Sequence, residues 1–600
     1  MTASSSDERA FLDVTRSLSG RQWADRLNPV GRNRALAIGQ TSGLPDIVAR
    51  VLAGRGVGAE GAEAFLDPTI RDLMPDPSTL TDMDAAARRI ATAIRNGERI
   101  AIFGDYDVDG AASAALMSRF LAAFGIAHEI HIPDRIFEGY GPNAPAIRQL
   151  VDNGARLIVT VDCGATSFEA LEEAAGLGAD VVVLDHHQMG VKVPRAVAVV
   201  NPNRQDDLSG LGYLCAAGVV FMTLVAVQRD LRAAGEKPGP NLIELLDLVA
   251  LATVCDVVPL TGLNRAFVVK GLQVMRAMGN AGLAALSAAA RLDGPLSTYH
   301  VAFLLGPRIN AGGRIGDAAL GSRLLSIDDP TVAEQIAAEL DRLNAERQAA
   351  EAVMLEEAIA EGEAEIGGDG AGGTGPAVLI TARQGWHAGI VGLLASRLKD
   401  RFARPAIAIA FDANGKGTGS GRSVSGVDLG AAVRAALEAG VIEKGGGHAM
   451  AAGLTVRRDR LGDLRAFLDE RLAADVARAM ANDRLRIDAA LSARGATLDL
   501  IDLLEKAGPY GAGHPQPVLA FPNHLLTYSR LVGRDHVSFS LQSSDGASLR
   551  GIAFRKAGTA LGEALLKGEG RRFHLAGTLG ADFWQGRRRV QLRLIDAAMA

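Results

Sequence analysis

Short apolar runs and amphipathic segments alternate along the first half of the chain. The runs are rich in Val, Ile and Leu and are bounded by polar residues or glycine, a pattern typical of buried strands. We expect these strands at 99–103, 128–132, 157–161, 180–184 and 196–200, separated by helical segments such as 111–124, 144–153 and 167–176. This alternation predicts a mostly parallel sheet covered by helices.

The pattern changes after residue 330. An Ala- and Glu-rich stretch at 331–359 contains many helix formers and predicts a long helix, long enough to separate two domains. A glycine-rich break follows at 367–375. A second α/β unit is then predicted from strand 376–381, helix 389–399 and strand 406–411.

The last part of the chain has the alternating pattern of short antiparallel strands. We expect these strands at 525–531, 536–541, 548–554, 572–578 and 589–595. Five strands of this kind suit a barrel of the oligonucleotide-binding (OB) type. The predicted fold class is therefore α/β, with two α/β domains joined by a long helix and a C-terminal OB-type β-barrel.

A chain of 600 residues is long enough for several domains. The lead-in region is expected at 1–82, the parallel-sheet domain at 83–330 and the connecting helix at 331–366. The second α/β domain is expected at 367–480 and the barrel at 481–600.

Charge is distributed unevenly over these domains. The net charge is −6, but residues from Ala481 onward contain 16 Lys and Arg against 11 Asp and Glu, which is +5 and leaves −11 for the rest. An acidic body with a basic C-terminal domain suggests chemistry in one part and binding of a polyanion in another.

The cysteines and the apolar segments limit the class of protein. Cys163, Cys215 and Cys255 form no paired framework, so disulfides and a structural zinc site are not expected. The first eight residues lack a signal-peptide pattern, and the most apolar long stretch, 242–260, is interrupted by acidic residues, which argues against a membrane span. We expect a soluble, cytoplasmic protein with no membrane partner.

Acidic and histidine side chains follow one predicted strand after another. Because ligands bind at the carboxyl ends of strands in an open parallel sheet, these side chains are expected to converge. The strand-end residues are Asp105, Asp107 and Asp109 after the first strand, Asp162 after the third and Asp185, His186 and His187 after the fourth. Asp256, at the end of an apolar helix that begins near Leu242, completes the set.

So many carboxylates are stable together only when they are protonated or bound to cations. Oxygen ligands with one or two imidazoles suit Mn²⁺ or Mg²⁺. Up to six carboxylates exceed the charge of one divalent ion, so two are expected. A pair ~3.5–4 Å apart would activate a water and stabilise the leaving oxygen of a phosphoester. Asp162, alone at a central strand end, is the candidate bridge between the ions.

Three simpler interpretations of the aspartates compete with a catalytic site. An EF-hand loop also begins Asp-x-Asp-x-Asp-Gly, but it needs a preceding helix and a Glu at position twelve, where this chain has Leu116. A solvated acidic turn would explain one cluster, but not the recurrence at successive strand ends. A purely structural metal site is the third alternative.

Two glycine-rich segments, 417–423 and 445–448, are candidates for anion binding. Glycine lets backbone N–H groups approach an anion, and Arg422 could add a two-pronged phosphate contact. Neither segment matches a Walker loop, and ordinary turns remain an alternative. In the C-terminal domain, Arg571–Arg572 and Arg587–Arg589 with Phe573, Phe583 and Trp584 suit single-stranded nucleic acid, with a solvated basic hairpin as the alternative.

The strand-end motifs resemble the DHH phosphoesterase superfamily. The residues that carry the resemblance are 104–110 (GDYDVDG), 161–164 (VDCG) and 185–187 (DHH), with support from 132–135, 138–141, 256–260 and 306–314. Residues 385–392, 420–423 and 447–453 resemble the associated DHHA1 domain. Taken in order from about Leu44 to the C-terminus, the motifs are most similar to the RecJ family of single-strand-specific exonucleases.

The resemblance implies an enzyme that degrades single-stranded DNA from 5′ to 3′, releases 5′-mononucleotides and depends on Mn²⁺ or Mg²⁺. It implies a role in DNA repair and recombination beside a RecQ-type helicase and the single-strand-binding protein. The implied metal ligands are Asp107, Asp109, Asp162, His186 and Asp256, with Asp105 next to them. His187 would face the scissile phosphate. Arg135, Ser420 and Arg422 would recognise the 5′-phosphate, and Arg308, Asn310, Arg314 and His448 would line the path of the strand.

Two rival functions make different predictions. A DHH enzyme acting on oligoribonucleotides, cyclic dinucleotides or pyrophosphate would not need the basic C-terminal domain, so loss of 517–600 would leave its binding unchanged. A non-catalytic scaffold that holds single strands would tolerate Asp162→Ala, whereas a two-metal enzyme would lose turnover and keep its fold.

Overall fold

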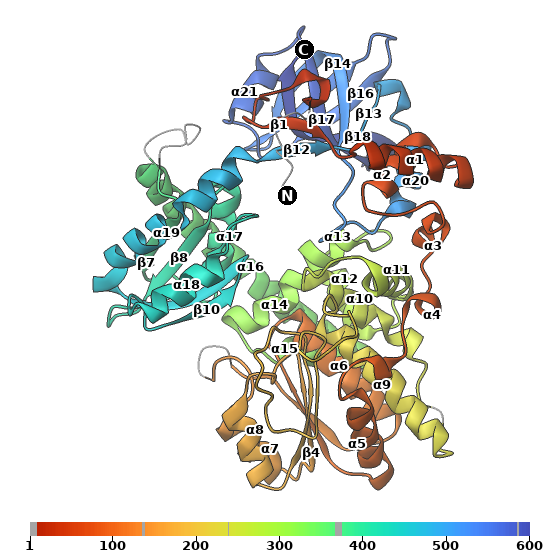
Figure 1. Cartoon of the computed structure of the whole chain (residues 1–600), viewed down its shortest axis with the longest axis vertical. Helices are drawn as coiled ribbons and strands as arrows, with labels where there is room; N and C mark the ends of the chain where they lie inside the picture. Colours follow the sequence, from red (N-terminus) through yellow and green to blue (C-terminus); the bar gives the residue numbers. More distant parts are fainter. Residues whose placement is uncertain (1–8, 135–137, 238, 367–374, 585–586) are drawn as a thin grey trace. The chain divides into compact units, whose positions relative to one another are not determined.

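The computed structural model describes residues 9–134, 138–237, 239–366, 375–584 and 587–600 (Figure 1). It divides into two compact units. Unit 1 comprises residues 1–56, 346–503 and 517–600, and unit 2 comprises residues 57–345 and 504–516.

Unit 2 contains a five-stranded sheet in the order β3-β2-β4-β5-β6, and every pairing is parallel. Its strands are β2 (Ile100–Gly104), β3 (His128–His131), β4 (Leu157–Val161), β5 (Asp180–Leu184) and β6 (Ala198–Val200). All residues of β2 and β4 are buried, as expected for central strands covered on both faces. The predicted parallel sheet is confirmed.

Helices cover both faces of this sheet. On one face, α5 (Met83–Asn96), α6 (Val108–Ala123), α9 (Ala216–Ala233) and α10 (Leu246–Cys255) share a core with Ile102, Val159 and Leu184. On the other face, α7 (Ala144–Asp152) and α8 (Phe168–Gly176) pack on Phe103, Ile158 and Val183, as Figure 1 shows around β4. Alternate residues of each strand therefore supply the two cores.

Further helices of unit 2 follow α10. They are α11 (Gly262–Arg276), α12 (Ala281–Ala289), α13 (Thr298–His300), the π-helix η4 (Val301–Leu305), α14 (Gly306–Ile315) and α15 (Leu320–Ser326). The predicted long helix is α16, Pro330–Ile366, which runs from unit 2 into unit 1.

Unit 1 contains a second sheet in the order β10-β11-β9-β8-β7. Its strands are β7 (Leu379–Gln384), β8 (Ala406–Phe411), β9 (Lys416–Arg422), β10 (Lys444–His448) and β11 (Ala451–Arg457). Only β7 and β8 pair in parallel. Helices α17 (Val391–Phe402), α18 (Leu429–Glu438) and α19 (Leu461–Ala481) accompany it.

The two glycine-rich segments of this sheet lie in strands β9 and β10 rather than in turns. A Cβ added at Gly419 would lie 2.8 Å from the Leu454 side chain, and one added at Gly421 would lie 2.7 Å from Leu429. The glycines of β9 therefore allow large neighbours to close over the strand, which is a packing requirement that propensity does not indicate.

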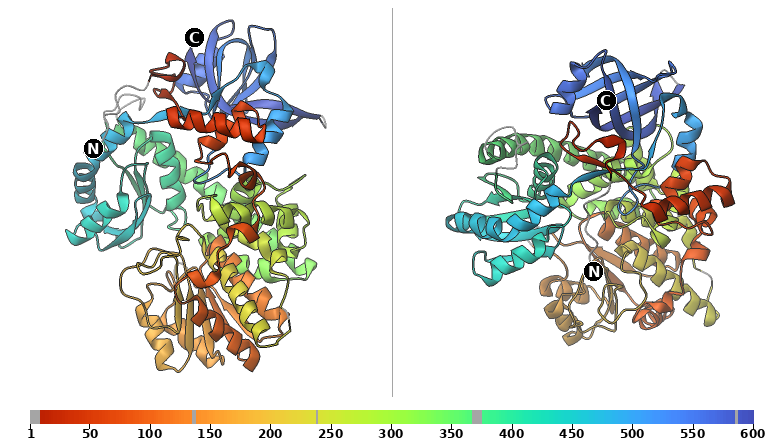
Figure 2. Two further views of the ribbon diagram at one scale, coloured as in Figure 1. Left: turned by 45° about the vertical axis from the view of Figure 1, so that its right-hand side comes forward. Right: turned by 45° about the horizontal axis from the view of Figure 1, so that its top comes forward.

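The C-terminal strands form a closed five-stranded barrel (Figure 2). Pairing runs β14-β15-β16-β18-β17, and an additional β14–β17 pairing closes the ring. The strands are β14 (Leu519–Val532), β15 (His536–Gln542), β16 (Ser548–Ala553), β17 (Arg572–Trp584) and β18 (Arg587–Met599). This confirms the predicted OB-type barrel, although four of its strands, β14, β15, β17 and β18, are longer than predicted.

The start of the chain packs with the barrel. Strand β1 (Gln22–Asp25) pairs in parallel with β12 (Arg484–Ile487), and the buried Trp23 donates its indole N–H to Asp596 at 3.0 Å. In the described part of the chain the three cysteines are free, and no helix has both the length and the apolarity to cross a membrane.

Candidate metal centre

The register of the parallel sheet brings the polar strand ends together. Gly104 pairs with Val161, and Val161 pairs with Leu184, so the last residues of β2, β4 and β5 lie side by side. Asp105, Asp162 and Asp185 follow these three residues and are all buried. The convergence predicted from the sequence is thus a direct consequence of strand register.

Asp107 and Asp109 belong to the start of helix α6, which begins three residues earlier than predicted. Asp107 is the N-cap, and its carboxylate accepts a hydrogen bond from Gly110 N at 3.0 Å. A Cβ at Gly110 would lie 2.4 Å from the Asp105 carbonyl oxygen. Glycine at this position therefore lets the helix start directly against the end of β2.

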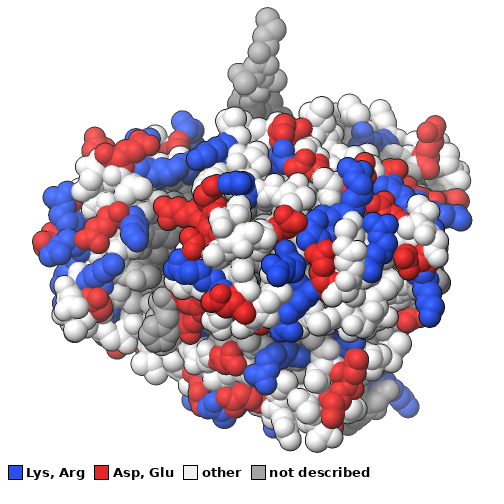
Figure 3. Space-filling model, turned by 90° about the horizontal axis from the view of Figure 1, so that it is seen from below, with Lys and Arg blue, Asp and Glu red and all other residues white. Residues whose placement is uncertain are grey.

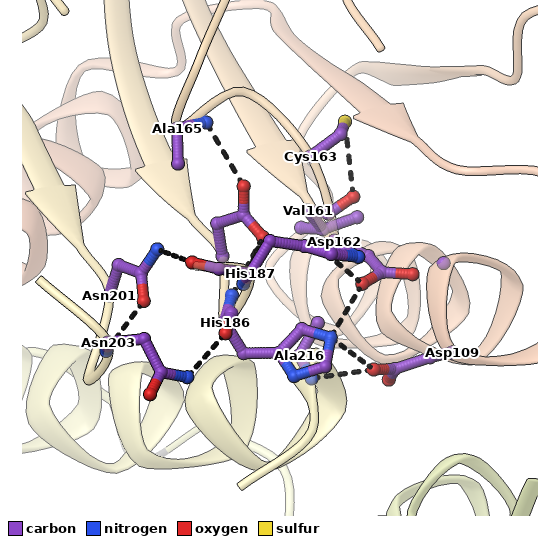
Figure 4. A network of polar contacts seen from close by, with 12 residues as sticks. Asp109, Val161, Asp162, Cys163, Ala165, His186, His187, Asn201, Asn203 and Ala216 are labelled. Atoms are coloured by element: carbon purple, nitrogen blue, oxygen red, sulfur yellow. Dashed lines mark hydrogen bonds and ion pairs between the residues drawn. The ribbon is translucent and has the colours of Figure 1, made fainter. Parts of the chain in front are cut away.

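Asp109 is held at the N-terminus of a second helix, α9. Its Oδ2 accepts a hydrogen bond from Ala216 N at 2.6 Å and its Oδ1 accepts one from Ala217 N at 2.9 Å (Figure 4). Two backbone N–H groups and the helix dipole offset part of the charge of this carboxylate. Burial nevertheless raises the pKa of Asp109.

Asp162 lies in the middle of the cluster with an unusual backbone conformation. Its φ is +61°, and its backbone N–H still donates to Leu184 O at 3.0 Å, so the chain turns sharply as β4 ends. Its Oδ1 is buried and has no hydrogen-bond partner among the described residues. Burial and the nearby Asp109 and Asp107 raise the pKa of Asp162 well above its usual range.

His186 points an unsatisfied ring nitrogen at these carboxylates. Its Nδ1 donates to Leu214 O at 3.1 Å, which leaves Nε2 as the ring nitrogen that can coordinate a cation. Nε2 lies 3.2 Å from Asp162 Oδ1, 3.7 Å from Asp109 Oδ2 and 3.7 Å from Asp256 Oδ2, as Figure 4 shows for the first two. In the described structure this buried nitrogen makes no hydrogen bond.

A buried lone pair facing buried carboxylate oxygens is costly, and a shared cation removes the cost. The donor set is also appropriate for a hard divalent ion, since it combines several oxygens with one imidazole whose other nitrogen is held by a carbonyl. The residues present therefore fit a metal centre.

Three overlapping groups of side chains have ligand atoms within 4.8 Å of one another. They are Asp105, Asp107 and Asp162; Asp109, His186 and Asp256; and Asp162, His186 and His187. Asp162 and His186 each belong to two of the three groups. The structure thus brings together every metal ligand proposed from the sequence.

His187 is oriented by Asp185. Asp185 Oδ1 accepts from His187 Nδ1 at 2.8 Å and from the backbone N of His186 and His187, and Oδ2 accepts from Ala165 N at 3.0 Å. Although burial opposes it, the hydrogen bond from His187 lowers the pKa of Asp185 to about 2. Although burial of the imidazole opposes it, the hydrogen bond and negative charge of Asp185 raise the pKa of His187 to about 9.

Asp256 ends helix α10 and is followed by a strained residue. Val257 has φ +61° although it is β-branched, and its side chain is 69% exposed. Burial and the charges of Asp109 and Asp107 raise the pKa of Asp256 to about 9.

The loop after Asp256 is held by the segment 504–516, which is about 250 residues away in the chain. Leu260 N donates to Ala512 O at 2.8 Å, and Asn264 Nδ2 donates to Pro259 O at 3.0 Å. A Cβ at Gly513 would lie 2.9 Å from Pro259 Cβ, so the two segments are in close contact.

The proposed substrate-binding residues fall into separate groups. In unit 1, Ser420 and Arg422 on β9 lie at the N-terminus of α17, where a Cβ at Gly392 would be 3.1 Å from Ser420 Oγ and 3.3 Å from Arg422 Nη2. His448 ends β10 and pairs in register with Ala451, which also pairs with Arg422. These three side chains therefore share one end of the second sheet.

In unit 2, α14 carries Arg308, Asn310 and Arg314. The Arg308 guanidinium is 15% exposed and is bonded to Asp341 at 2.8 Å and to Leu304 O at 2.7 Å. Arg135, the remaining predicted phosphate-binding residue, lies outside the described residues.

Sequence reasoning assigned no role to three residues that contact the two histidines. Tyr140 OH lies 3.2 Å from His187 Nδ1 and donates to Asp162 O at 3.2 Å. Asn201 donates to His187 O at 2.9 Å and Asn203 donates to His186 O at 2.5 Å (Figure 4). The two asparagines directly follow β6, so the strand-end pattern that identified the aspartates could have identified them as well.

Models of known families match three parts of the chain. The DHH family N-terminal domain matches residues 99–253, the DHHA1 domain matches residues 375–474 and the RecJ OB domain matches residues 487–596. These matches confirm the predicted resemblance and the predicted order of the three folds.

Characterised proteins match almost the full length. The single-stranded-DNA-specific exonuclease RecJ of Escherichia coli is 36% identical over 567 residues, which cover 92% of this chain and 96% of that protein. The protein of the same name from Bacillus subtilis is 34% identical, over 92% of this chain and 68% of its own length.

Solved structures show the same architecture. The crystal structure of RecJ in complex with Mn²⁺ from Thermus thermophilus covers 95% of this chain and 78% of its own, with a TM-score of 0.77 and 28% identity. A crystal structure of exonuclease RecJ bound to manganese is 34% identical and covers 68% of this chain and 97% of its own, with a TM-score of 0.56.

Proposed function

The chain belongs to the RecJ family of single-stranded-DNA-specific exonucleases, and on that premise we propose that it hydrolyses phosphodiester bonds of single-stranded DNA with two divalent metal ions. The proposal extends to degradation from the 5′ end with release of 5′-mononucleotides. The observation that carries it is the buried Asp162 Oδ1, which has no hydrogen-bond partner among the described residues and faces Nε2 of His186 among four other aspartates.

The metal ligands are proposed to be Asp105, Asp107, Asp109, Asp162, His186 and Asp256, with Mn²⁺ or Mg²⁺ as the ions. Asp162 would contribute to both positions because its carboxylate lies within reach of two ligand groups. When bound, such ions activate a water and stabilise the charge that develops on the leaving oxygen.

His187 is proposed to be the residue that contacts the scissile phosphate. Its Nδ1 is held by Asp185 and Tyr140, so the ring orientation is fixed and Nε2–H is the group left to donate. The side chain is 46% exposed, in contrast to 12% for the side chain of His186 beside it. A hydrogen bond from Nε2 to a non-bridging phosphate oxygen would stabilise negative charge in the transition state.

A 5′-terminal phosphate is proposed to bind at the N-terminus of α17. Ser420 Oγ and the Arg422 guanidinium meet the first turn of this helix, so a hydroxyl, a cation and backbone N–H groups face the same point. Arg135, which lies outside the described residues, is proposed to recognise the 5′-phosphate from the family resemblance alone. Arg308, Asn310, Arg314 and His448 are proposed to contact the strand beyond its terminal nucleotide.

The barrel is proposed to bind further nucleotides through its basic hairpin at Arg587–Arg589. Arg588 pairs with Asp502 at 2.7 Å, so Arg587 and Arg589 are the residues proposed for phosphate contacts. The structure does not describe the side chains of Phe583 and Trp584, the aromatic residues of this hairpin. On the face of the molecule in Figure 3, acidic and basic side chains are interspersed.

The cellular role is proposed by family analogy. It comprises DNA repair and recombination in the cytoplasm, with a RecQ-type helicase that supplies single strands and the single-strand-binding protein that covers them.

The proposed function is tested by digestion of a single strand labelled at one end, in the presence of Mn²⁺. With a 5′ label we expect immediate release of labelled mononucleotide, and with a 3′ label we expect progressive shortening. Immediate release from the 3′ label would reverse the polarity. Cleavage of dinucleotides or pyrophosphate without degradation of long strands would instead support a small-substrate DHH enzyme.

A further inference from the structure

Two exposed aromatic side chains lie on the consecutive helical turns α13 and η4. Tyr299, on α13, is 56% exposed and Phe303, on the π-helix η4, is 64% exposed. Their ring centroids are 5.1 Å apart with an interplanar angle of 36°. We call Tyr299 and Phe303 the aromatic pair. Large apolar side chains that are exposed together, rather than singly, are typical of binding surfaces.

The buried residues of the same helical turn pack next to Cys255. Val301 and Leu305 are fully buried, and Cys255 Sγ, one residue before Asp256, lies 3.6 Å from Val301 O. A Cβ at Gly306 would lie 2.5 Å from the same sulfur, so both ends of η4 rest on Cys255. The π-helical turn is itself a feature that is frequent at functional sites.

The surroundings of the aromatic pair favour a nucleic acid. Helix α14 follows η4 directly and carries Asn310 and Arg314, which are both proposed to contact the strand. Arg308 of the same helix is not a free cation, because its guanidinium is bonded to Asp341 and to Leu304 O. Exposed aromatic rings next to residues proposed to contact the strand match a polymer that offers an unpaired base at each step.

We propose that Tyr299 and Phe303 form a stacking site for unpaired nucleobases of the substrate strand. This inference rests on the proposed function and adds to it a physical basis for single-strand specificity. Every base presents a π-face, so the site accepts any sequence, whereas the bases of a duplex are stacked on one another and cannot enter.

Binding of matched oligonucleotides to the full chain in EDTA, measured by fluorescence anisotropy, tests this proposal. One strand carries normal bases and the other carries a run of abasic tetrahydrofuran residues behind a normal 5′-phosphorylated nucleotide. We expect the wild type to bind the strand with bases about tenfold more tightly or better. The double variant Tyr299→Ala/Phe303→Ala should bind the two strands almost equally.

Control variants separate stacking from other effects. Tyr299→Phe keeps the ring and should keep the preference, and Leu208→Ala removes a 94% exposed side chain elsewhere in unit 2 and should behave as wild type. The salt dependence of binding should be the same in all variants because no phosphate contact is removed.

A double variant that retains the wild-type preference for bases would overturn the stacking site while leaving the exonuclease function intact. Failure of the wild type to degrade single strands at all would instead overturn the proposed function. A preference that disappears in Leu208→Ala as well would show that the effect does not arise from the aromatic pair.

Discussion

At the scale of single residues, the centre is a set of carboxylates whose charges are only partly offset by the protein. Asp109 receives two backbone N–H groups and Asp185 receives three, but Asp162 Oδ1 has no hydrogen-bond partner among the described residues. The raised pKa values of Asp162 and Asp256 have the same origin, since burial and mutual repulsion both oppose ionisation. A site built in this way is unfavourable until cations enter it.

Asp162→Asn should therefore have opposite effects on stability and on activity. Removing one buried carboxylate should raise the melting temperature in EDTA and reduce the further increase that Mn²⁺ produces in the wild type. Turnover should fall by at least about 100-fold. Loss of a residue that only supports a metal ligand costs at most about that much, so loss of a ligand should cost more. Thermal melting with and without Mn²⁺ measures the first effect, and the exposed Asp293→Asn is the matched control. Equal Mn²⁺ stabilisation of wild type and Asp162→Asn would contradict the ligand assignment.

The His187–Asp185 pair should make the stability of the metal-free protein depend on pH. The pKa of Asp185 falls from 3.8 to about 2 on folding, so its contribution is present above pH 3.8 and is lost as the pH falls through about 2. The pKa of His187 rises from 6.5 to about 9, so its contribution is present below pH 6.5 and is lost as the pH rises through about 9. Both contributions are fully present between pH 3.8 and pH 6.5. Urea unfolding in EDTA should therefore show that Asp185→Asn reduces the free energy of unfolding most in this range and least above pH 9. A constant difference from about pH 5 to about pH 9.5 would rule out the pair as its source.

The sequence identified the metal ligands because each follows an apolar run or an apolar helix, and parallel register then brings the strand ends together. It did not indicate the hydrogen bonds of Tyr140, Asn201 and Asn203, because these depend on the orientation of side chains after folding. The sequence also did not predict that Phe303 is exposed, because a Phe within the apolar run Val301–Leu305 is expected to be buried.

At the scale of elements, helix ends and one distant segment position the ligands. The N-termini of α6 and α9 fix Asp107 and Asp109, and the segment 504–516 supports the loop that follows Asp256. This support crosses about 250 residues of chain, so no local pattern indicated it. The sequence predicted β4, β5 and β8 with their observed bounds because uniform apolar runs mark them, whereas glycine concealed β9 and β10.

Gly513→Ala should test whether the segment 504–516 positions Asp256. Gly513 and Gly533 have almost the same φ, +66° and +65°, but only an alanine at 513 would press against Pro259. Both substitutions should reduce stability by about 1 kcal/mol for the left-handed backbone. Gly513→Ala should in addition weaken Mn²⁺ binding, measured by calorimetry, while Gly533→Ala should not. The same Mn²⁺ affinity in both variants would show that the segment is merely structural.

At the scale of the whole molecule, the proposed strand-binding residues are divided between the two units. Unit 2 contains the carboxylate centre, whereas Ser420, Arg422, His448 and the basic barrel belong to unit 1. The excess of basic residues after Ala481 was visible in the sequence and agrees with this division. The sequence did not show that β1 and Trp23 pack with the barrel. Because of this packing, deletion of 517–600 would also expose buried residues of unit 1.

Substitution is therefore a cleaner test of the barrel than deletion. Arg587→Gln/Arg589→Gln should weaken binding of long strands and flatten the slope of log affinity against log salt by about 1.4, or about 0.7 for each lost phosphate contact. Binding of strands shorter than the reach of the barrel should not change. An unaltered slope on long strands would exclude these two arginines from the interface.

The carboxylate cluster is proposed to bind two divalent ions with Asp162 between them. Titration of the full chain with Mn²⁺, followed by calorimetry and by electron paramagnetic resonance, tests it most directly. We expect two ions per chain with a spin-coupled signal, and loss of the coupling in Asp162→Ala. Binding of a single uncoupled ion to the wild type, or two coupled ions in Asp162→Ala, would contradict the account.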